Sequence, residues 1–136
     1  MKIVLDSNIL FSALIKDSLT RRLILEYDEN FIFPYYIFEE LTKHKAELLT
    51  KSQMDGTEFE QLLQLLLTKV IIIQEDILDS YKIEAINIIN HLDPDDTMFI
   101  ACALAYPGSV IWSNDKRLAL QNKIKIISTK EMIELI

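Results

Sequence analysis

Short apolar runs rich in β-branched residues recur along the chain and alternate with longer segments of helical spacing. The first run is 2–5, and later ones cover 31–33, 70–73, 109–112 and 124–127. Runs that are apolar along their whole length are typical of strands buried on both faces of a sheet. Because a helical segment separates each run from the next, we expect the strands to be parallel.

The segments between the runs complete this pattern. Apolar residues recur at helical spacing over 8–28 in two pieces, 35–50, 56–68, 76–91, 94–106, 115–121 and 129–136. Helices between parallel strands cover both faces of the sheet. The 136 residues are enough for one ordinary domain. We therefore predict a single α/β domain over 1–136, with a central parallel sheet of about five strands in a three-layer α/β/α arrangement.

The composition excludes several classes of site. With two glycines, Gly56 and Gly108, the chain cannot form a Walker A loop or a dinucleotide fingerprint. Cys102 and the isolated His44 and His91 cannot form a zinc cage. No apolar stretch approaches the roughly 18–20 residues of a membrane span, and the first residues lack the apolar core of a secretory signal. With no disulfide pairing open to the single cysteine, we expect a cytoplasmic protein.

Acidic residues dominate the charge, with 21 acids against 14 bases and a net charge of −7. In open α/β sheets, ligands bind in the crevice outside the carboxyl ends of the strands. Asp6 follows the first run and Asp115 follows the fourth. Glu40 lies one turn into the helix after the second run, and Asp96 lies near the start of the helix that leads into the fourth. These acids are the first candidates for a site.

Some of these acids also have a purely structural explanation. Asp93 followed by Pro94 is a typical helix start, with acids in the first turn. Asp115 is likewise placed to cap the helix that follows it. Asp6 is different, because an acid that ends a buried strand needs a partner or a solvent-filled cleft. Taken alone, Asp6 therefore favours a functional interpretation. The acids at 93–96 and Asp115, each taken alone, favour a structural one.

Helical geometry separates the two neighbouring glutamates. In the helix over 35–50, Glu39 lies nearly opposite the apolar stripe, whereas Glu40 lies on its flank and can reach a cleft. His44 lies on the stripe, where a histidine is more often a satisfied group at the edge of the core than a ligand. Cys102 is flanked by apolar residues and is expected to be a small buried hydrophobe rather than a nucleophile.

Convergence of four acids on one crevice would have an electrostatic consequence. Two carboxylates about 5 Å apart repel each other by roughly 3 kcal/mol at an effective dielectric constant near 20. A bound divalent cation relieves this repulsion. Hard oxygen ligands without histidine or thiolate favour Mg²⁺ or Mn²⁺ over zinc.

Four acidic segments, in this order and spacing, resemble the motifs of the PIN-domain nucleases. They are 4–10, 38–41, 96–104 and 111–115. The resemblance covers the whole chain and implies a parallel sheet flanked by helices. Small bacterial and archaeal members of this family are often toxin ribonucleases paired with an antitoxin, so the resemblance extends to VapC-like toxins.

The resemblance implies a set of metal-binding and catalytic acids for one or two Mg²⁺ or Mn²⁺ ions. These acids are Asp6, Glu40, Asp96 and Asp115. It further implies polar support from Asn8 and from either Ser113 or Asn114. The third motif also contains Asp93 and Asp95, which remain alternatives to Asp96 as the ligand.

The expected activity is metal-dependent endoribonuclease action, in which a water attacks the RNA phosphodiester without a covalent protein intermediate. The basic pairs Arg21–Arg22 and Lys116–Arg117 are candidates for contacts with RNA phosphates, against an otherwise acidic balance. An antitoxin and a second copy of the chain are the protein partners to consider, and no membrane association is expected.

Other functions fit parts of the pattern. A PIN fold that has lost catalysis would be a protein- or RNA-binding module, which agrees with the low basic content. A receiver-like phosphoacceptor domain could use Asp76 with Lys125 or Lys130, but its first strand would end in two acids, and here it ends in Asp6 and Ser7. A haloacid-dehalogenase-like phosphatase would need an acid where Asn8 stands.

Overall fold

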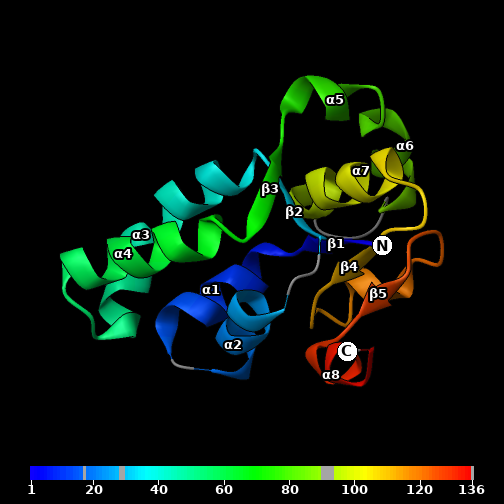
Figure 1. The fold of residues 1–136 in the computed structure, drawn as a ribbon. Coiled ribbons are helices and arrows are strands. Elements are labelled where there is room, and N and C mark those ends of the chain that lie inside the picture. The colour runs from blue at the N-terminus through cyan, green and yellow to red at the C-terminus, as the bar shows by residue number, and fades with distance from the viewer. Residues whose placement is uncertain (17, 28–29, 90–93, 136) are drawn as a thin grey trace.

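A parallel sheet forms the centre of the computed structural model, which describes residues 1–16, 18–27, 30–89 and 94–135 (Figure 1). Its strands are β1 (Lys2–Leu5), β2 (Asn30–Pro34), β3 (Val70–Ile73), β4 (Val110–Trp112) and β5 (Ile126–Ile127). The sheet order is β3-β2-β1-β4-β5, and all neighbouring strands are parallel. The five predicted apolar runs are therefore confirmed as strands, with ends that differ by one or two residues.

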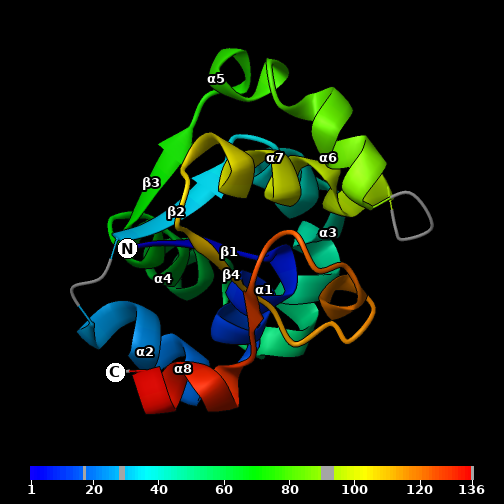
Figure 2. The ribbon, with the colours of Figure 1, turned by 90° about the vertical axis from the view of Figure 1, so that its right-hand side faces the viewer.

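The helices complete the layers. They are α1 (Ser7–Ile15), α2 (Leu19–Glu26), α3 (Ile37–Ser52), α4 (Gly56–Leu67), α5 (Glu75–Asp79), α6 (Lys82–Ile88), α7 (Thr97–Ala105) and α8 (Thr129–Leu135), with short 3₁₀ turns at Pro94–Asp96 and Leu118–Leu120. Figure 2 shows α5, α6 and α7 on one face of the sheet and α1, α2 and α8 on the other. This arrangement confirms the predicted three-layer α/β/α fold.

The central strands are buried because both faces of the sheet are covered. Ile3, Val4 and Leu5 of β1 have no exposed surface, and neither does Trp112 of β4. Cys102 of α7 is also completely buried, and burial raises the pKa of its thiol to about 12. It is therefore an inert core residue, as the sequence predicted.

Two predicted helices differ from the structure. The segment predicted as one helix over 76–91 is broken into α5 and α6, and both pieces pack against α7. The helix predicted over 115–121 is reduced to the 3₁₀ turn at 118–120. Here the side chain of Asp115 accepts a hydrogen bond from the backbone N–H of Arg117, and Gln121 bonds the backbone of Ile124. Such local side-chain bonds compete with helix formation.

Helices α3 and α4 form an antiparallel pair that extends to the left in Figure 1. Gln53 ends α3 in the left-handed conformation, with φ 59°. Asp55 and Glu58 form a capping box at the start of α4, and the ammonium of Lys45 lies 2.6 Å from a carboxylate oxygen of Glu60. The short turn, the caps at its two ends and this ion pair hold α3 and α4 side by side.

Strand β1 lies at the point where the direction of the strand order reverses, because β2 pairs with one of its edges and β4 with the other. The backbone N–H of Asp6 donates to the carbonyl of Trp112, so the residue after β1 is joined directly to the last residue of β4. Ligands of open α/β sheets bind at such a point. None of the helices in the described ranges is long and apolar enough to cross a membrane.

Candidate active site

A cleft of about 490 Å³ opens at the carboxyl ends of β1 and β4 and continues between α1 and α3. The acids that line its inner part are Asp6, Glu40, Asp95, Asp96 and Asp115. They come from four segments that are far apart in the sequence. The structure thus brings all four sequence-predicted acids to one cleft, together with Asp95.

Asp6 is the most buried of these acids, with 5% of its surface exposed. The hydroxyl of Ser113 donates a hydrogen bond of 2.7 Å to its Oδ2 atom. Burial raises the pKa of Asp6, and the nearby charge of Asp115 raises it further, against the opposing effect of the Ser113 bond. The site therefore favours a cation beside this carboxylate, because a cation would offset the cost of keeping it ionised.

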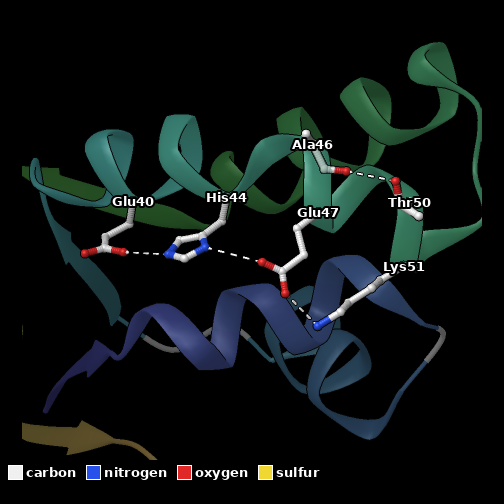
Figure 3. Close-up of polar contacts among 6 residues, drawn as sticks. All are labelled: Glu40, His44, Ala46, Glu47, Thr50 and Lys51. Carbon is white, nitrogen blue, oxygen red and sulfur yellow. Dashed lines mark hydrogen bonds and ion pairs between the residues drawn. The ribbon is translucent and has the colours of Figure 1, made fainter.

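Glu40 is 8% exposed and is held from both sides along α3. The Nε2 atom of His44 lies 3.4 Å from its Oε2 atom (Figure 3). One turn earlier, the hydroxyl of Tyr36 is hydrogen-bonded to the same carboxylate, and burial together with this bond raises the pKa of Tyr36. Glu39, by contrast, is exposed. The predicted difference between the two glutamates is confirmed, and His44 is a partnered histidine.

The third motif places two acids at the cleft. Asp96 is at the N-cap position of α7, yet its side chain makes no capping hydrogen bond to that helix. Asp95, which precedes it, is exposed and also lines the cleft. The structure thus keeps both as candidates. The predicted capping role of Asp93 lies outside the described residues.

Asp115 is linked to Asp6 through Ser113. The backbone N–H of Asp115 donates to the Ser113 hydroxyl at 3.0 Å, and that hydroxyl donates to Asp6. The Asp115 Oδ1 atom accepts the N–H of Arg117 at 2.9 Å, so this residue both stabilises its turn and lines the cleft. The structural and functional interpretations of Asp115 are therefore compatible.

The three predicted supporting residues, Asn8, Ser113 and Asn114, have different surroundings in the structure. Asn8 is exposed and lines the cleft. Of the two alternatives near β4, Ser113 contacts Asp6, whereas the amide of Asn114 is engaged with Thr129 at the start of α8 through two hydrogen bonds. Ser113 is therefore the one of these two residues that contacts Asp6 and Asp115, whereas Asn114 bonds to the start of α8.

The four predicted phosphate-contacting cations lie outside the lining of the cleft. Arg21 donates through Nε to the carbonyl of Ala13 at 2.7 Å, which joins α2 to α1. The Nε atom of Arg22 lies 3.5 Å from a carboxylate oxygen of Glu26. Lys116 and Arg117 are exposed directly after Asp115.

The sequence patterns did not single out two residues of α3 that line the cleft. They placed a third, His44, at the edge of the core. Glu47 and Lys51 line the cleft together with His44. They follow Glu40 by seven and eleven residues, and His44 follows it by four, so all lie on one face of the helix. Extending the helical spacing beyond Glu40 would have identified them.

The chemistry of this part of the cleft suits a hard divalent cation, since its candidate ligands are oxygens, chiefly those of the carboxylates together with the amide oxygen of Asn8. No three acidic, histidine or cysteine side chains of the described residues are arranged as a ready-made metal site. The arrangement offers carboxylates from four segments along one cleft, and their negative charge attracts cations.

Comparisons with known proteins agree with the fold. VapBC2 from Rickettsia felis, whose crystal structure has it bound to a DNA fragment from its promoter, superimposes with a TM-score of 0.71 at 15% identity, covering 94% of this chain and 98% of that one. PAE2754 from Pyrobaculum aerophilum superimposes with a TM-score of 0.66 at 14% identity, covering 99% and 88%. No curated protein is similar enough in sequence to be counted as a relative.

The family comparison is the most specific one. The model of the PIN domain matches residues 4–134, a range that includes all the acids of the cleft. At 14–15% identity the two solved structures show a common fold, and the family match adds the sequence pattern. The chain belongs to the PIN-domain family of nucleases.

Proposed function

We propose that this protein is a metal-dependent endoribonuclease that hydrolyses phosphodiester bonds of RNA in the cytoplasm. The observation that carries the proposal is the meeting of Asp6, Glu40, Asp96 and Asp115 in one cleft at the carboxyl ends of β1 and β4. Membership of the PIN-domain family supports it.

One or two Mg²⁺ or Mn²⁺ ions would be held by these four acids, with Asp95 as the alternative in the third motif. A divalent ion supplies charge stabilisation for the phosphodiester and makes an attacking water more acidic. The chain positions the ligands. Ser113 holds one oxygen of Asp6, and Tyr36 and His44 hold Glu40. One of the carboxylates would accept the proton of the attacking water.

The phosphates next to the scissile bond would contact Lys116 and Arg117, which are exposed beside Asp115. Arg21 and Arg22 would contribute less, because both already have partners on the protein. RNA binding by these groups should weaken as the salt concentration rises.

The experiment that tests the function is incubation with single-stranded and structured RNA in Mg²⁺, in Mn²⁺ and in chelator. We expect cleavage with either metal and none in chelator, without a covalent enzyme adduct. Robust cleavage in chelator would overturn the metal-dependent mechanism. Intact RNA under all conditions would overturn the enzymatic function.

Metal binding can also be measured without RNA. Mg²⁺ or Mn²⁺ should raise the melting temperature, because a ligand bound only by the folded protein stabilises it by about 2.7 kcal/mol at a hundredfold excess over its dissociation constant. Asp115→Asn should reduce this shift. A melting temperature that does not respond to millimolar metal would contradict the site.

The different contacts of Ser113 and Asn114 lead to a paired prediction. Ser113→Ala removes the donor to buried Asp6, and we expect a loss of about 10–100-fold in metal affinity or cleavage, as for other groups that orient metal ligands. Asn114→Ala should cost about 0.5–2 kcal/mol of stability, as for a lost helix cap, and should leave cleavage intact. Cleavage rates at low temperature and melting curves of both variants decide this. Loss of activity in a stable Asn114→Ala protein would reverse the assignment.

We further propose that the nuclease is the toxin of a toxin–antitoxin pair. The similar structure from Rickettsia felis is of VapBC2, and the acidic motifs of this chain resemble those of the PIN-domain nucleases, a family that includes VapC-like toxins. Expression of the gene alone should slow growth, and co-expression of a neighbouring small gene should restore it. A second copy of the chain is the other partner to test, by measuring the mass in solution.

A second candidate is a PIN-fold module that binds RNA or protein without cutting. The lack of a ready-made metal cluster among the described residues and the net charge of −7 favour it. It predicts no metal-dependent cleavage and no loss of binding when the four acids are changed to amides. The nuclease predicts the opposite results, namely cleavage that requires a metal and weaker metal-supported RNA binding when these acids are changed.

A further inference from the structure

The cleft does not end at the acids but continues as a groove between α1 and α3, which pack against each other. Beyond the five acids named above, the residues of α1 and α3 along this groove include Phe11, Ile15, His44, Glu47, Leu48 and Lys51. At about 1.5 Å per helical residue, the side of α3 from Glu40 to Lys51 is roughly 16 Å long. The nuclease function proposed above uses only the acidic end.

Two rings meet where the groove leaves the acids. The centroids of Phe11 and His44 are 5.4 Å apart, and their planes are tilted by 59°. Phe11 is only partly buried, and the side chain of His44 is 35% exposed. The groove therefore presents aromatic surface to solvent directly beside the carboxylate of Glu40.

The charged groups farther along the groove are paired with each other. Lys51 donates to Glu47 at 2.7 Å, and another oxygen of Glu47 lies 3.6 Å from Nδ1 of His44 (Figure 3). A phosphate at this position would have to displace Glu47 from Lys51 and would be repelled by it. A neutral, flat ligand with donors and acceptors on its edges avoids both costs. Ile15 and Leu48 add apolar surface for such a ligand.

We propose that this groove is a subsite for an unpaired nucleobase of the RNA substrate, stacked on Phe11, with its edge toward Glu47 and Lys51. The proposal depends on the RNA-cleaving function above and extends it. Bases stack on exposed aromatic side chains only when they are free of a duplex. The subsite would therefore make the enzyme selective for a single-stranded nucleotide next to the scissile phosphate.

The test uses short unstructured oligoribonucleotides in which one nucleotide at a time is abasic. Binding is measured by fluorescence anisotropy in Ca²⁺, and cleavage is measured in parallel in Mn²⁺. At one position near the cleavage site, loss of the base should weaken binding by about fivefold to a hundredfold, the range expected for one base stacked on an aromatic ring. Loss of a base at the other positions should have a much smaller effect.

Phe11→Leu should weaken binding of the intact RNA and remove most of the penalty of the abasic nucleotide at that one position. Coupling of this kind is expected only when the two altered groups touch each other. Phe38→Leu is the matched control, because Phe38 is another partly buried aromatic residue, which packs against Tyr35 outside the cleft. It should keep the full penalty. Phe11→Met provides a second substitution, and circular dichroism checks the folding of each variant.

The outcomes separate this subsite from the nuclease function. An equal penalty at every position, or an unchanged penalty in folded Phe11→Leu and Phe11→Met proteins, overturns the subsite even if RNA is cut. A position-specific penalty that depends on Phe11, without cleavage in any metal, supports the subsite and overturns the nuclease. Absence of RNA binding overturns both.

Discussion

Asp6→Asn is expected to lower RNA cleavage by at least about a hundredfold, because the substitution removes a proposed metal ligand from the floor of the cleft. The same variant should be as stable as the wild type or more stable in the absence of metal. The reason is that the wild-type carboxylate is 5% exposed and faces the charge of Asp115. Asparagine keeps the shape and can still accept the hydrogen bond of Ser113.

The stability gain should depend on pH in a defined direction. Burial raises the pKa of folded Asp6 above its unfolded value, so ionisation of this group disfavours the folded state. Below about pH 4, near the ordinary pKa of aspartate, the group is protonated in both states and the variant gains nothing. As the pH rises through the raised pKa, the advantage of Asp6→Asn should grow and then level off.

Melting curves in chelator from acidic to neutral pH, with cleavage assays in Mn²⁺, measure both effects. Asp55→Asn is a control for the chemical change itself, because Asp55 is a capping residue of α4 and does not line the cleft. Wild-type cleavage by Asp6→Asn would remove this residue from the mechanism. A marked loss of metal-free stability at neutral pH would show that the electrostatic explanation is incorrect.

Glu40→Gln and Glu39→Gln should differ by about a hundredfold or more in cleavage, although they are the same substitution at adjacent positions of α3. Glu40 is 8% exposed and lines the cleft, whereas Glu39 is exposed and outside it. Glutamine at position 40 can still accept a hydrogen bond from Tyr36 but carries no charge for a cation. Glutamate and glutamine have similar helix propensity, so neither variant should unfold α3.

The measurements are the cleavage rate and the rise in melting temperature on adding Mn²⁺. Glu39→Gln should match the wild type in both, and Glu40→Gln should lose both. Equal loss in the two variants would indicate a general effect of charge on RNA or metal binding rather than a ligand role. Full activity of Glu40→Gln would exclude Glu40 as a ligand.

Local patterns in the sequence were sufficient to predict the strands and to place Glu40, rather than Glu39, where it can reach the cleft. A run such as 70–73 is apolar and β-branched, and these are local properties that favour a buried strand. Helical periodicity placed Glu40 and not Glu39 at the cleft for a similarly local reason. Periodicity failed for 115–121, where side-chain bonds from Asp115 and Gln121 to the backbone replaced a regular helix.

The sequence by itself determined the fold class and the family resemblance and indicated four candidate acids, because these depend on residue type, order and spacing. Only the tertiary structure showed that Ser113 rather than Asn114 contacts Asp6, since the two bonded residues are 107 positions apart. It also showed that Arg21 is engaged with the backbone of α1 and that the cleft continues past Phe11 toward Lys51. Such contacts depend on how whole elements pack across the sheet, which no local pattern specifies.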